Sequence, residues 1–395
     1  MGHASRQRSG TPSRGPKSRW GKEPGWPSPL AARRESDVPQ TIKTPRLPCV
    51  QPRCAARQER AVSEAGGPRV RGRLEQYLDI VGSQRLSDIE DISQRRRNQA
   101  ELAAPRPGRT APPDIEVIAY SAWPGTDPKV RVRVYRPAGS GAPSPCLYYI
   151  HGDGLVPGSA GSDDAKASWL AQAVGCVVVS AEYRLAPENP YPAAVDDRFA
   201  GLRWLAGSPH ELGIDPDRIA LHGSSAGGCL AAATALLARD RGGPAIAHLM
   251  LISPMLDDRC PTASHGTNTG FRAWSRGANI QAWQAYLGKV FGTDRVPAYA
   301  APARADDLAG LPPTYVDVGD LDLFRDEAVD FAHRMMRAGV PVELHVHPGG
   351  IHGGETLAPE ADLSARVRSY RLGALRRALF AQPSGRPSPS AQWSG

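Results

Sequence analysis

The sequence predicts an α/β fold in which a mostly parallel central sheet of about eight strands is flanked by helices. From residue 146 onward, short apolar segments alternate with segments that have the helical spacing of apolar residues. Such alternation is typical of parallel strands joined by helices that cover both faces of the sheet. The 395 residues suit one large domain with additions, or two small ones.

Each predicted element follows from its own apolar pattern, and a hairpin or meander precedes the alternation. The predicted strands are residues 115–121, 130–135, 146–150, 176–183, 219–222, 246–253, 314–318 and 341–347. The predicted helices are residues 71–103, 165–174, 193–206, 229–239, 325–338 and 361–379. A long polar stretch over about 258–292, with three large aromatic residues (Phe271, Trp274 and Trp283), interrupts the alternation.

The basic charge of the chain is confined to its first 70 residues. They hold 14 Lys and Arg against 5 Asp and Glu, whereas the remainder holds 34 against 35. The part predicted to fold therefore lacks the positive charge that binding of nucleic acid requires, and we expect no nucleic-acid partner. Residues 1–70 and 381–395 are rich in Pro and Ser and poor in aliphatic residues, so we expect both to be disordered tails.

The sequence predicts neither membrane insertion nor a metal site. The first 29 residues contain no apolar core of a secretory signal, and no apolar run is long enough to span a bilayer. The six cysteines are scattered, and Cys49 and Cys54 lack the second Cys or His pair of a zinc site. We therefore expect reduced thiols and a cytoplasmic protein.

Residues 223–227, Gly-Ser-Ser-Ala-Gly, show the G-x-S-x-G pattern between a buried strand and a helix of small residues. A serine on such a sharp turn projects its hydroxyl outward, and side chains at the two glycine positions would collide with the strand and the helix. The N-terminus of the helix also favours developing negative charge. The strand-turn-helix context makes Ser225 the candidate nucleophile, because the bare pattern also arises by chance.

A nucleophilic serine needs a base and an acid that orients the base, both in loops after later strands. In the order Ser, acid, His, the base is predicted to be His352, in the glycine-rich loop after the last strand. Asp320 and Asp322 both follow the strand 314–318. We favour Asp322 as the acid, although spacing alone separates the two aspartates poorly.

The glycine-dense loop that begins at His151 follows an early predicted strand, which is where an oxyanion hole is expected. Glycine there lets the backbone approach a substrate carbonyl closely. The predicted N–H donors are those of Gly152, Asp153, Gly154 and Ala226, the last being the residue after the nucleophile.

Five motifs in this order resemble the hormone-sensitive-lipase-like group of α/β-hydrolases, also described as the fold-3 group, over residues 74 to 378. They are the His-Gly-Asp-Gly of residues 151–154, the segment 182–194 with its Tyr-Arg-Leu-Ala-Pro-Glu, and residues 223–228, 322–327 and 351–353. The resemblance implies the α/β-hydrolase fold, a triad of Ser225, Asp322 and His352, and no metal or organic cofactor. Many members of the family form homodimers through the sheet edge near the last strand.

The resemblance also implies a domain plan. A helical cap is expected from the helices in residues 71–112 together with the insertion 258–292, and the hydrolase domain is expected over 113–380. Two positions depart from the family pattern. Asp153 occupies a position that is usually Gly, and its carboxylate would oppose an oxyanion unless it points away or is protonated. Ser224 occupies a position that is frequently Asp.

We therefore predict a serine carboxylesterase that hydrolyses short- to medium-chain acyl esters through an acyl-serine intermediate. Its partner would be a small-molecule ester, without stable membrane insertion. The alternative is a catalytically weak or silent hydrolase-fold protein that binds small molecules, and Asp153 is the feature that favours it.

Overall fold

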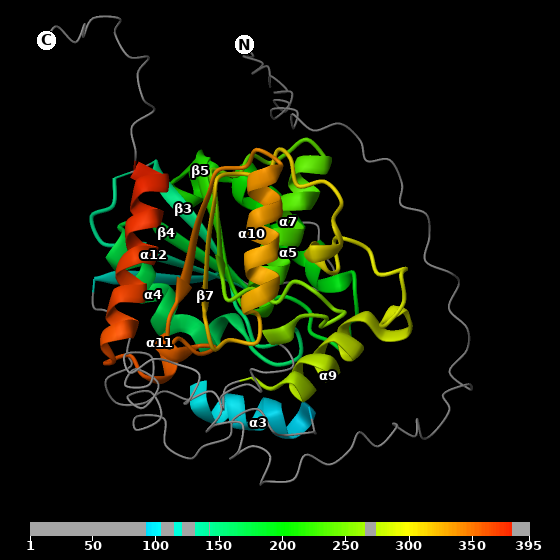
Figure 1. Cartoon of the computed structure of the whole chain (residues 1–395). Coiled ribbons are helices and arrows are strands. Elements are labelled where there is room, and N and C mark those ends of the chain that lie inside the picture. The colour runs from blue at the N-terminus through cyan, green and yellow to red at the C-terminus, as the bar shows by residue number, and fades with distance from the viewer. Residues whose placement is uncertain (1–91, 104–113, 121–130, 142, 265–273, 381–395) are drawn as a thin grey trace, which may run out of the picture. The chain divides into compact units, whose positions relative to one another are not determined.

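An eight-stranded sheet forms the centre of the computed structural model, which describes residues 92–103, 114–120, 131–141, 143–264 and 274–380 (Figure 1). The strands are β1 (Ile115–Tyr120), β2 (Val132–Pro137), β3 (Ser144–Ile150), β4 (Val177–Ala181), β5 (Ile214–Ser224), β6 (His248–Ile252), β7 (Thr314–Gly319) and β8 (Val342–His347). Their spatial order is β1-β2-β4-β3-β5-β6-β7-β8. β2 pairs antiparallel with both β1 and β4, and all other neighbours are parallel. This topology confirms the predicted fold class.

Helices cover both faces of the sheet. α4 (Asp164–Val174) and α12 (Asp362–Phe380) lie on one face, and α5 (Ala193–Gly207), α7 (Ala226–Asp240) and α10 (Arg325–Arg337) lie on the other (Figure 1). One apolar cluster fills the side of α5, α7 and α10, and a second fills the side of α4 and α12. The central strands are therefore buried on both faces, as their continuous apolar runs predict.

The remaining helices are short or lie outside the two layers. They are α3 (Ile92–Ala103), α6 (Pro209–Leu212), α9 (Arg276–Leu287) and α11 (Gly354–Leu357), with 3₁₀ turns over Ala160–Asp163, Gly288–Val290 and Pro302–Arg304. α3 lies beside α9 (Figure 1), and Nη2 of Arg95 donates to Oε1 of Gln281 over 3.1 Å. The tails predicted over 1–70 and 381–395, and the helical pattern before residue 92, lie outside the described residues.

The structure differs from the predicted elements chiefly at their ends. The strand predicted over 176–183 ends at Ala181, beyond which Tyr183 directs its hydroxyl to the carbonyl oxygen of Gly152. β5 extends back to Ile214 through a charged segment that has no apolar pattern. α7 begins at Ala226, earlier than its apolar pattern predicts. The four-residue helices α6 and α11 are too short to give a helical period, and neither was predicted.

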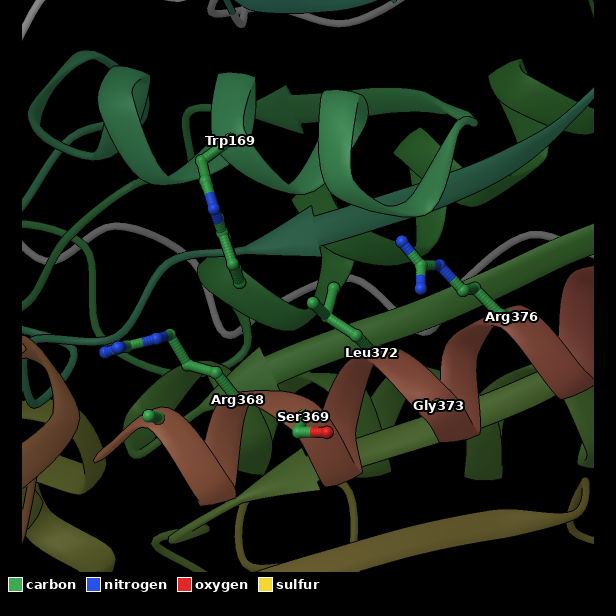
Figure 2. A pocket seen from close by; sticks show the side chains of 7 residues that line it. Trp169, Arg368, Ser369, Leu372, Gly373 and Arg376 are labelled. Atoms are coloured by element: carbon green, nitrogen blue, oxygen red, sulfur yellow. The ribbon is translucent and has the colours of Figure 1, made fainter. Parts of the chain in front are cut away.

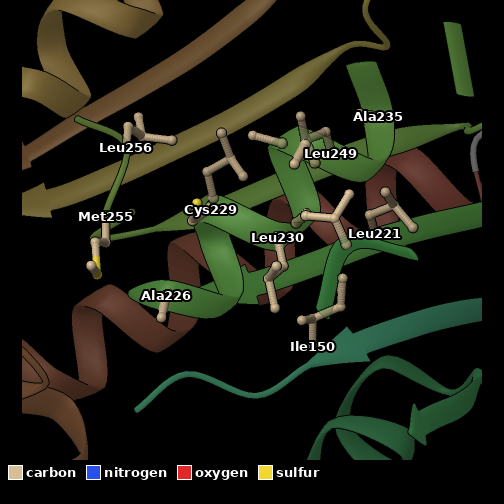
Figure 3. Packing of buried hydrophobic residues seen from close by; sticks show 14 of the residues in the cluster. Ile150, Leu221, Ala226, Cys229, Leu230, Ala235, Leu249, Met255 and Leu256 are labelled. Carbon is tan, nitrogen blue, oxygen red and sulfur yellow. The ribbon is translucent and has the colours of Figure 1, made fainter. Parts of the chain in front are cut away.

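α7 packs against the central strands through small and aliphatic side chains (Figure 3). Leu230 and Cys229 of this helix lie in the same buried cluster as Ile150 of β3, Leu221 of β5 and Leu249 of β6. The small residues of α7 let its backbone approach the sheet closely, which fixes the position of the helix N-terminus. Cys229 is fully buried in this cluster.

A buried ion network joins the last helix to the sheet and to α11. Nε and Nη2 of Arg371 on α12 bind both carboxylate oxygens of Asp317 on β7, over 2.6 and 3.1 Å. Nη1 of the same guanidinium binds Oε1 of Glu355 over 2.7 Å. Burial alone would raise the pKa of Asp317, but the charge of Arg371 outweighs it and lowers this pKa to about 2. The network therefore holds the buried carboxylate of Asp317 and the largely buried carboxylate of Glu355 ionised on one cation.

An open depression of about 410 Å³ lies between α4 and α12 (Figure 2). Trp169 and Leu372 form its apolar part, and Arg368 and Arg376 flank it. Both guanidinium groups also donate to backbone carbonyls of the chain. None of the predicted catalytic or oxyanion-loop residues lines this depression, so it is separate from the site described below.

We expect Arg371→Met to lower the free energy of unfolding by about 3–5 kcal/mol, because it leaves the buried Asp317 and the largely buried Glu355 without their shared cation. Arg377→Met is the matched control on the same helix. Its pair with Glu343 is exposed and should contribute less than about 1 kcal/mol. Urea unfolding of both variants measures the difference, and wild-type stability of Arg371→Met would contradict the prediction.

Candidate active site

Ser225 lies on the sharp turn between β5 and α7. It caps the helix with φ 56° and ψ −122°, a left-handed conformation that costs free energy for any residue other than glycine. A Cβ atom on Gly223 would lie 2.1 Å from the carbonyl oxygen of Gly227, and one on Gly227 would lie 2.2 Å from that of Ile150. The two glycines of the motif are therefore required by close backbone approach, as the sequence predicts.

Backbone hydrogen bonds hold the strained turn in place. The N–H of Ser225 donates to the carbonyl oxygen of Ile252 at the end of β6 over 2.8 Å. Its carbonyl oxygen accepts from the N–H of Met255 over 3.0 Å and from that of Gly228 over 2.9 Å. The strands and loops around the turn thus fix the direction of the Ser225 hydroxyl.

The structure brings Ser225, His352 and Asp322 together from three distant parts of the chain. Nε2 of His352 lies 3.2 Å from Oγ of Ser225, and Nδ1 lies 2.8 Å from Oδ2 of Asp322. Oδ1 of the fully buried Asp322 accepts from the N–H of Phe324 over 3.0 Å. The Phe324 ring contacts His352 edge-on, with centroids 5.2 Å apart. The Asp322 carboxylate and the Phe324 ring thereby fix the orientation of the imidazole.

Asp320, the other candidate acid, contacts the backbone of Gly349. Its Oδ1 accepts from the N–H of Gly349 over 2.7 Å, so it joins the loop after β7 to the loop that carries His352. Burial raises the pKa of its carboxyl group. The structure therefore places Asp322 against the imidazole and gives Asp320 a part in holding the loop.

Electrostatics at the site favour the protonated form of His352. Burial lowers the pKa of the imidazole, but the charge of Asp322 and the hydrogen bond to it raise it, with smaller contributions from Glu355 and Asp153. The net result is a pKa above the ordinary value. The same carboxylate of Asp322 stabilises the positive charge that His352 acquires when it takes a proton from a serine hydroxyl.

Two further histidines lie within β8, as the sequence predicts, and away from Ser225. His345 and His347 stack on each other with centroids 5.8 Å apart, and Tyr370 of α12 stacks on both. His345 contacts Glu343 and His347 contacts Asp317. Their neighbours are structural groups of β7, β8 and α12.

The predicted oxyanion loop lies directly beside the nucleophile. A Cβ atom on Gly152 would lie 3.5 Å from Cβ of Ser225 and 2.8 Å from the carbonyl oxygen of Ser224. Asp153, Gly154 and Leu155 follow with positive φ values of 76°, 70° and 67°. This run of left-handed residues turns the backbone sharply next to Ser225.

The Asp153 side chain extends toward Gly158. A Cβ atom on Gly158 would lie 2.8 Å from Oδ2 of Asp153 and 2.9 Å from Nδ1 of His151. The carboxylate thus lies on the side of the buried His151 ring, yet within electrostatic reach of His352, whose pKa it helps to raise. Burial lowers the pKa of His151 to about 4, so that ring is neutral at pH 7.

Sequence reasoning missed two residues that support the site. The hydroxyl of Tyr183 donates to the carbonyl oxygens of Gly152, over 2.9 Å, and His151, over 3.2 Å. Oε1 of the buried Glu327 accepts from the N–H of Leu256 over 2.7 Å and so holds the loop that follows β6. Tyr183 belongs to the Tyr-Arg-Leu-Ala-Pro-Glu motif, which is the available signal for its role, although the apolar pattern predicts a strand through this residue.

Two further findings concern metals and membranes. Within the described ranges, no group of three or more His, Cys, Asp or Glu side chains is arranged to hold a metal ion. In the same part of the chain, no helix combines the length and apolar character needed to cross a bilayer.

Comparison with known proteins assigns the chain to a family. A family model described as alpha/beta hydrolase fold matches residues 147–355. Esterase LipI of Mycobacterium tuberculosis (strain ATCC 25618 / H37Rv) is 34% identical over 310 residues, which cover 78% of this chain and 94% of that protein. The chain belongs to the α/β-hydrolase fold family.

Other esterases are similar to this α/β-hydrolase along most of their length. The solved structure of a bacterial heroin esterase matches with a TM-score of 0.72 at 38% identity, covering 78% of this chain and 97% of that one. Ethyl acetate hydrolase of Pseudomonas putida is 32% identical over 296 residues, covering 71% of this chain and 90% of that protein. These relatives confirm the predicted resemblance to the hormone-sensitive-lipase-like, or fold-3, group.

We expect Asp322→Asn to lower kcat for an ester by about 10⁴-fold, because the amide no longer holds the required tautomer of His352. It should also move the acidic limb of kcat/KM to lower pH, since the carboxylate that raises the His352 pKa is gone. Asp320→Asn should leave the limb in place and cost less than about tenfold. Equal losses in the two variants, measured from pH 5 to 9, would contradict this assignment.

Proposed function

We propose that this α/β-hydrolase hydrolyses carboxylic esters with Ser225 as the nucleophile, His352 as general base and acid, and Asp322 as the residue that orients His352. The observation that carries the proposal is the continuous contact from Asp322 through His352 to Ser225. The esterase names of its relatives support the ester as the substrate class.

The first half of the reaction forms an acyl-enzyme. Oγ of Ser225 attacks the ester carbonyl carbon while Nε2 of His352 takes the hydroxyl proton. The carbonyl oxygen becomes an oxyanion, and the N–H groups of the loop 152–154 and of Ala226 are its proposed donors. The intermediate then expels the alcohol oxygen, which takes the proton from His352, and the acyl group remains on Ser225.

The second half releases the acid. His352 takes a proton from a water molecule as that water adds to the acyl carbonyl carbon. The second tetrahedral intermediate breaks its bond to Oγ of Ser225, which regains a proton from His352. Groups of the chain itself carry out every proton transfer, so the proposed cycle includes no cofactor.

Short- to medium-chain acyl esters are the proposed substrates. Ethyl acetate, which the name of the Pseudomonas putida relative gives, is an ester of a short acid and supports this range. The alternative of a catalytically weak or silent binding protein would not require the contacts among Ser225, His352 and Asp322. Their geometry therefore favours turnover.

A homodimer and a cytoplasmic location are further parts of the proposal. β8 ends the strand order, and Val346 on it and Tyr370 beside it are about two-fifths exposed, which supports pairing at this edge. Four buried cysteines are free among the described residues, and free thiols suit a reducing compartment. Light scattering of the purified chain tests the dimer, and a mass of one chain at micromolar concentration would contradict it.

We expect Ser225→Ala to lower kcat by about 10⁴–10⁶-fold with little change in thermal stability, because only one hydroxyl is removed. Ser224→Ala, its neighbour, is the matched control and should retain activity. A series of p-nitrophenyl esters of increasing acyl length should give its highest kcat/KM at acyl chains of about eight carbons or fewer. Full activity of Ser225→Ala would disprove the assigned nucleophile, and a maximum at long chains would disprove the substrate range.

We expect Asp153→Asn and Asp153→Gly to raise kcat by about tenfold, or roughly 1.4 kcal/mol in the barrier, because both remove a negative charge from the loop beside Ser225. Both should also move the acidic limb of the rate profile to lower pH, since Asp153 helps to raise the pKa of His352. Neutral and amine-bearing esters should be compared. A loss of activity confined to amine-bearing esters would instead make Asp153 a binding group for substrate cations.

A further inference from the structure

The loop beside Ser225 has a conformation that it cannot hold by itself. Asp153, Gly154 and Leu155 are consecutive residues with positive φ, and two of them carry side chains. Positive φ is unfavourable for Asp153 and Leu155, which carry side chains, so the loop persists only where surrounding contacts fix it. The groups that contact this loop therefore decide where its N–H groups point.

Part of the support comes from the segment after β4. The N–H of Ala186 donates to the carbonyl oxygen of Leu155 over 3.0 Å, and the Leu155 side chain is buried in the core. Tyr183 binds the start of the loop at the carbonyl oxygen of Gly152. The loop and this segment thus form one unit, and the position of that unit depends on its contacts with the rest of the chain.

Arg96 of α3 joins the two parts of that unit. Its Nε donates to the carbonyl oxygen of Val156 over 3.0 Å, and its Nη2 donates to that of Ala186 over 2.9 Å. Glu188 binds the same guanidinium through both carboxylate oxygens, over 2.7 and 2.8 Å, in an exposed ion pair. The planar, forked guanidinium suits this role, because it can donate to several acceptors in a fixed geometry.

Arg95, the residue before Arg96 on α3, contacts the loop indirectly, through the indole ring of Trp274. A Cβ atom on Gly154 would lie 2.2 Å from Cη2 of Trp274, so the ring packs directly on this glycine. The guanidinium carbon of Arg95 lies 5.4 Å from the centroid of the Trp274 ring. Arg95 also binds Gln281 of α9, so α3 contacts both α9 and Trp274.

We propose that α3 positions the oxyanion loop, through contacts of Arg96 with the carbonyl groups of Val156 and Ala186 and through the stacking of Arg95 on Trp274. Both arginines are positioning residues, because they contact the loop or its supports. The inference rests on the proposed function of Ser225. It makes α3 part of the catalytic assembly and links its position to stabilisation of the oxyanion.

The expected kinetic effect follows from when the oxyanion forms. Loop N–H groups bind the negative oxygen of the tetrahedral intermediate more strongly than the neutral carbonyl of the substrate. Loosening the loop should therefore lower kcat and change KM little. Removal of one such donor costs about 10²–10³-fold in kcat in serine hydrolases. Displacement should cost less, about 10–100-fold.

The test compares Arg96→Met with two matched variants. Arg97→Met changes the next residue of α3, whose Nη2 donates to Gln94 within the helix. Glu188→Gln weakens the exposed ion pair but keeps the donors of Arg96 to both carbonyl groups. The readouts are kcat and KM for p-nitrophenyl butyrate, and the affinity for a trifluoromethyl ketone, which forms a tetrahedral oxyanion adduct with the serine.

In Arg96→Met we expect kcat to fall about 10–100-fold, the affinity for the ketone to fall by a similar factor, and KM to stay within about threefold. Arg97→Met and Glu188→Gln should stay within about twofold of wild type. Arg96→Lys, which keeps one donor group, should give an intermediate kcat. It also serves as the test variant if Arg96→Met does not fold.

The inference is overturned if Arg96→Met matches Arg97→Met in kcat and ketone affinity, or if only its KM changes. A wild-type chain without esterase activity, or an active Ser225→Ala, would instead disprove the proposed function. The two failures are therefore distinguishable, because one appears in the variants of α3 and the other in wild type or at Ser225.

Discussion

The left-handed backbone of Ser225 is the constraint on which the rest of the site depends. A non-glycine residue holds φ 56° only because β6 supplies an acceptor for its N–H and the following loop supplies a donor for its carbonyl group. Gly223 and Gly227 allow strand, helix and oxyanion loop to meet at this point. The parallel order of β3, β5, β6, β7 and β8 places the loops that carry the other site residues at the same edge of the sheet.

His352 depends on a second set of contacts. Asp322 fixes one nitrogen of its imidazole, while Asp320 ties the loop before it to β7. Glu355, three residues after His352, is held by Arg371 of α12, which also binds the sheet through Asp317. The ion network around Arg371 thus supports the loop that carries His352. The same contacts that stabilise the fold therefore also orient the base.

The sequence predicted the elements that follow from a repeating apolar pattern and the turn that follows from close backbone approach. Alternating apolar segments indicated the sheet and its helices, and the glycine pattern indicated the turn at Ser225. Spacing could not separate Asp320 from Asp322, since both follow β7 and only the direction of each side chain distinguishes them. The contacts of Arg96 were likewise beyond sequence reasoning, because they join residues 60 and 90 positions apart without a periodic signal.

The central claim is that Ser225 carries the acyl group during turnover. Mixing the enzyme with excess p-nitrophenyl acetate, quenching within milliseconds and digesting the chain would locate that group by mass spectrometry. We predict one acetyl group per active chain on the peptide that contains Ser225, together with a stoichiometric burst of p-nitrophenol when deacylation is the slower step. Acetyl groups on a different residue, or turnover without any acylated Ser225 at the earliest quench times, would contradict the account.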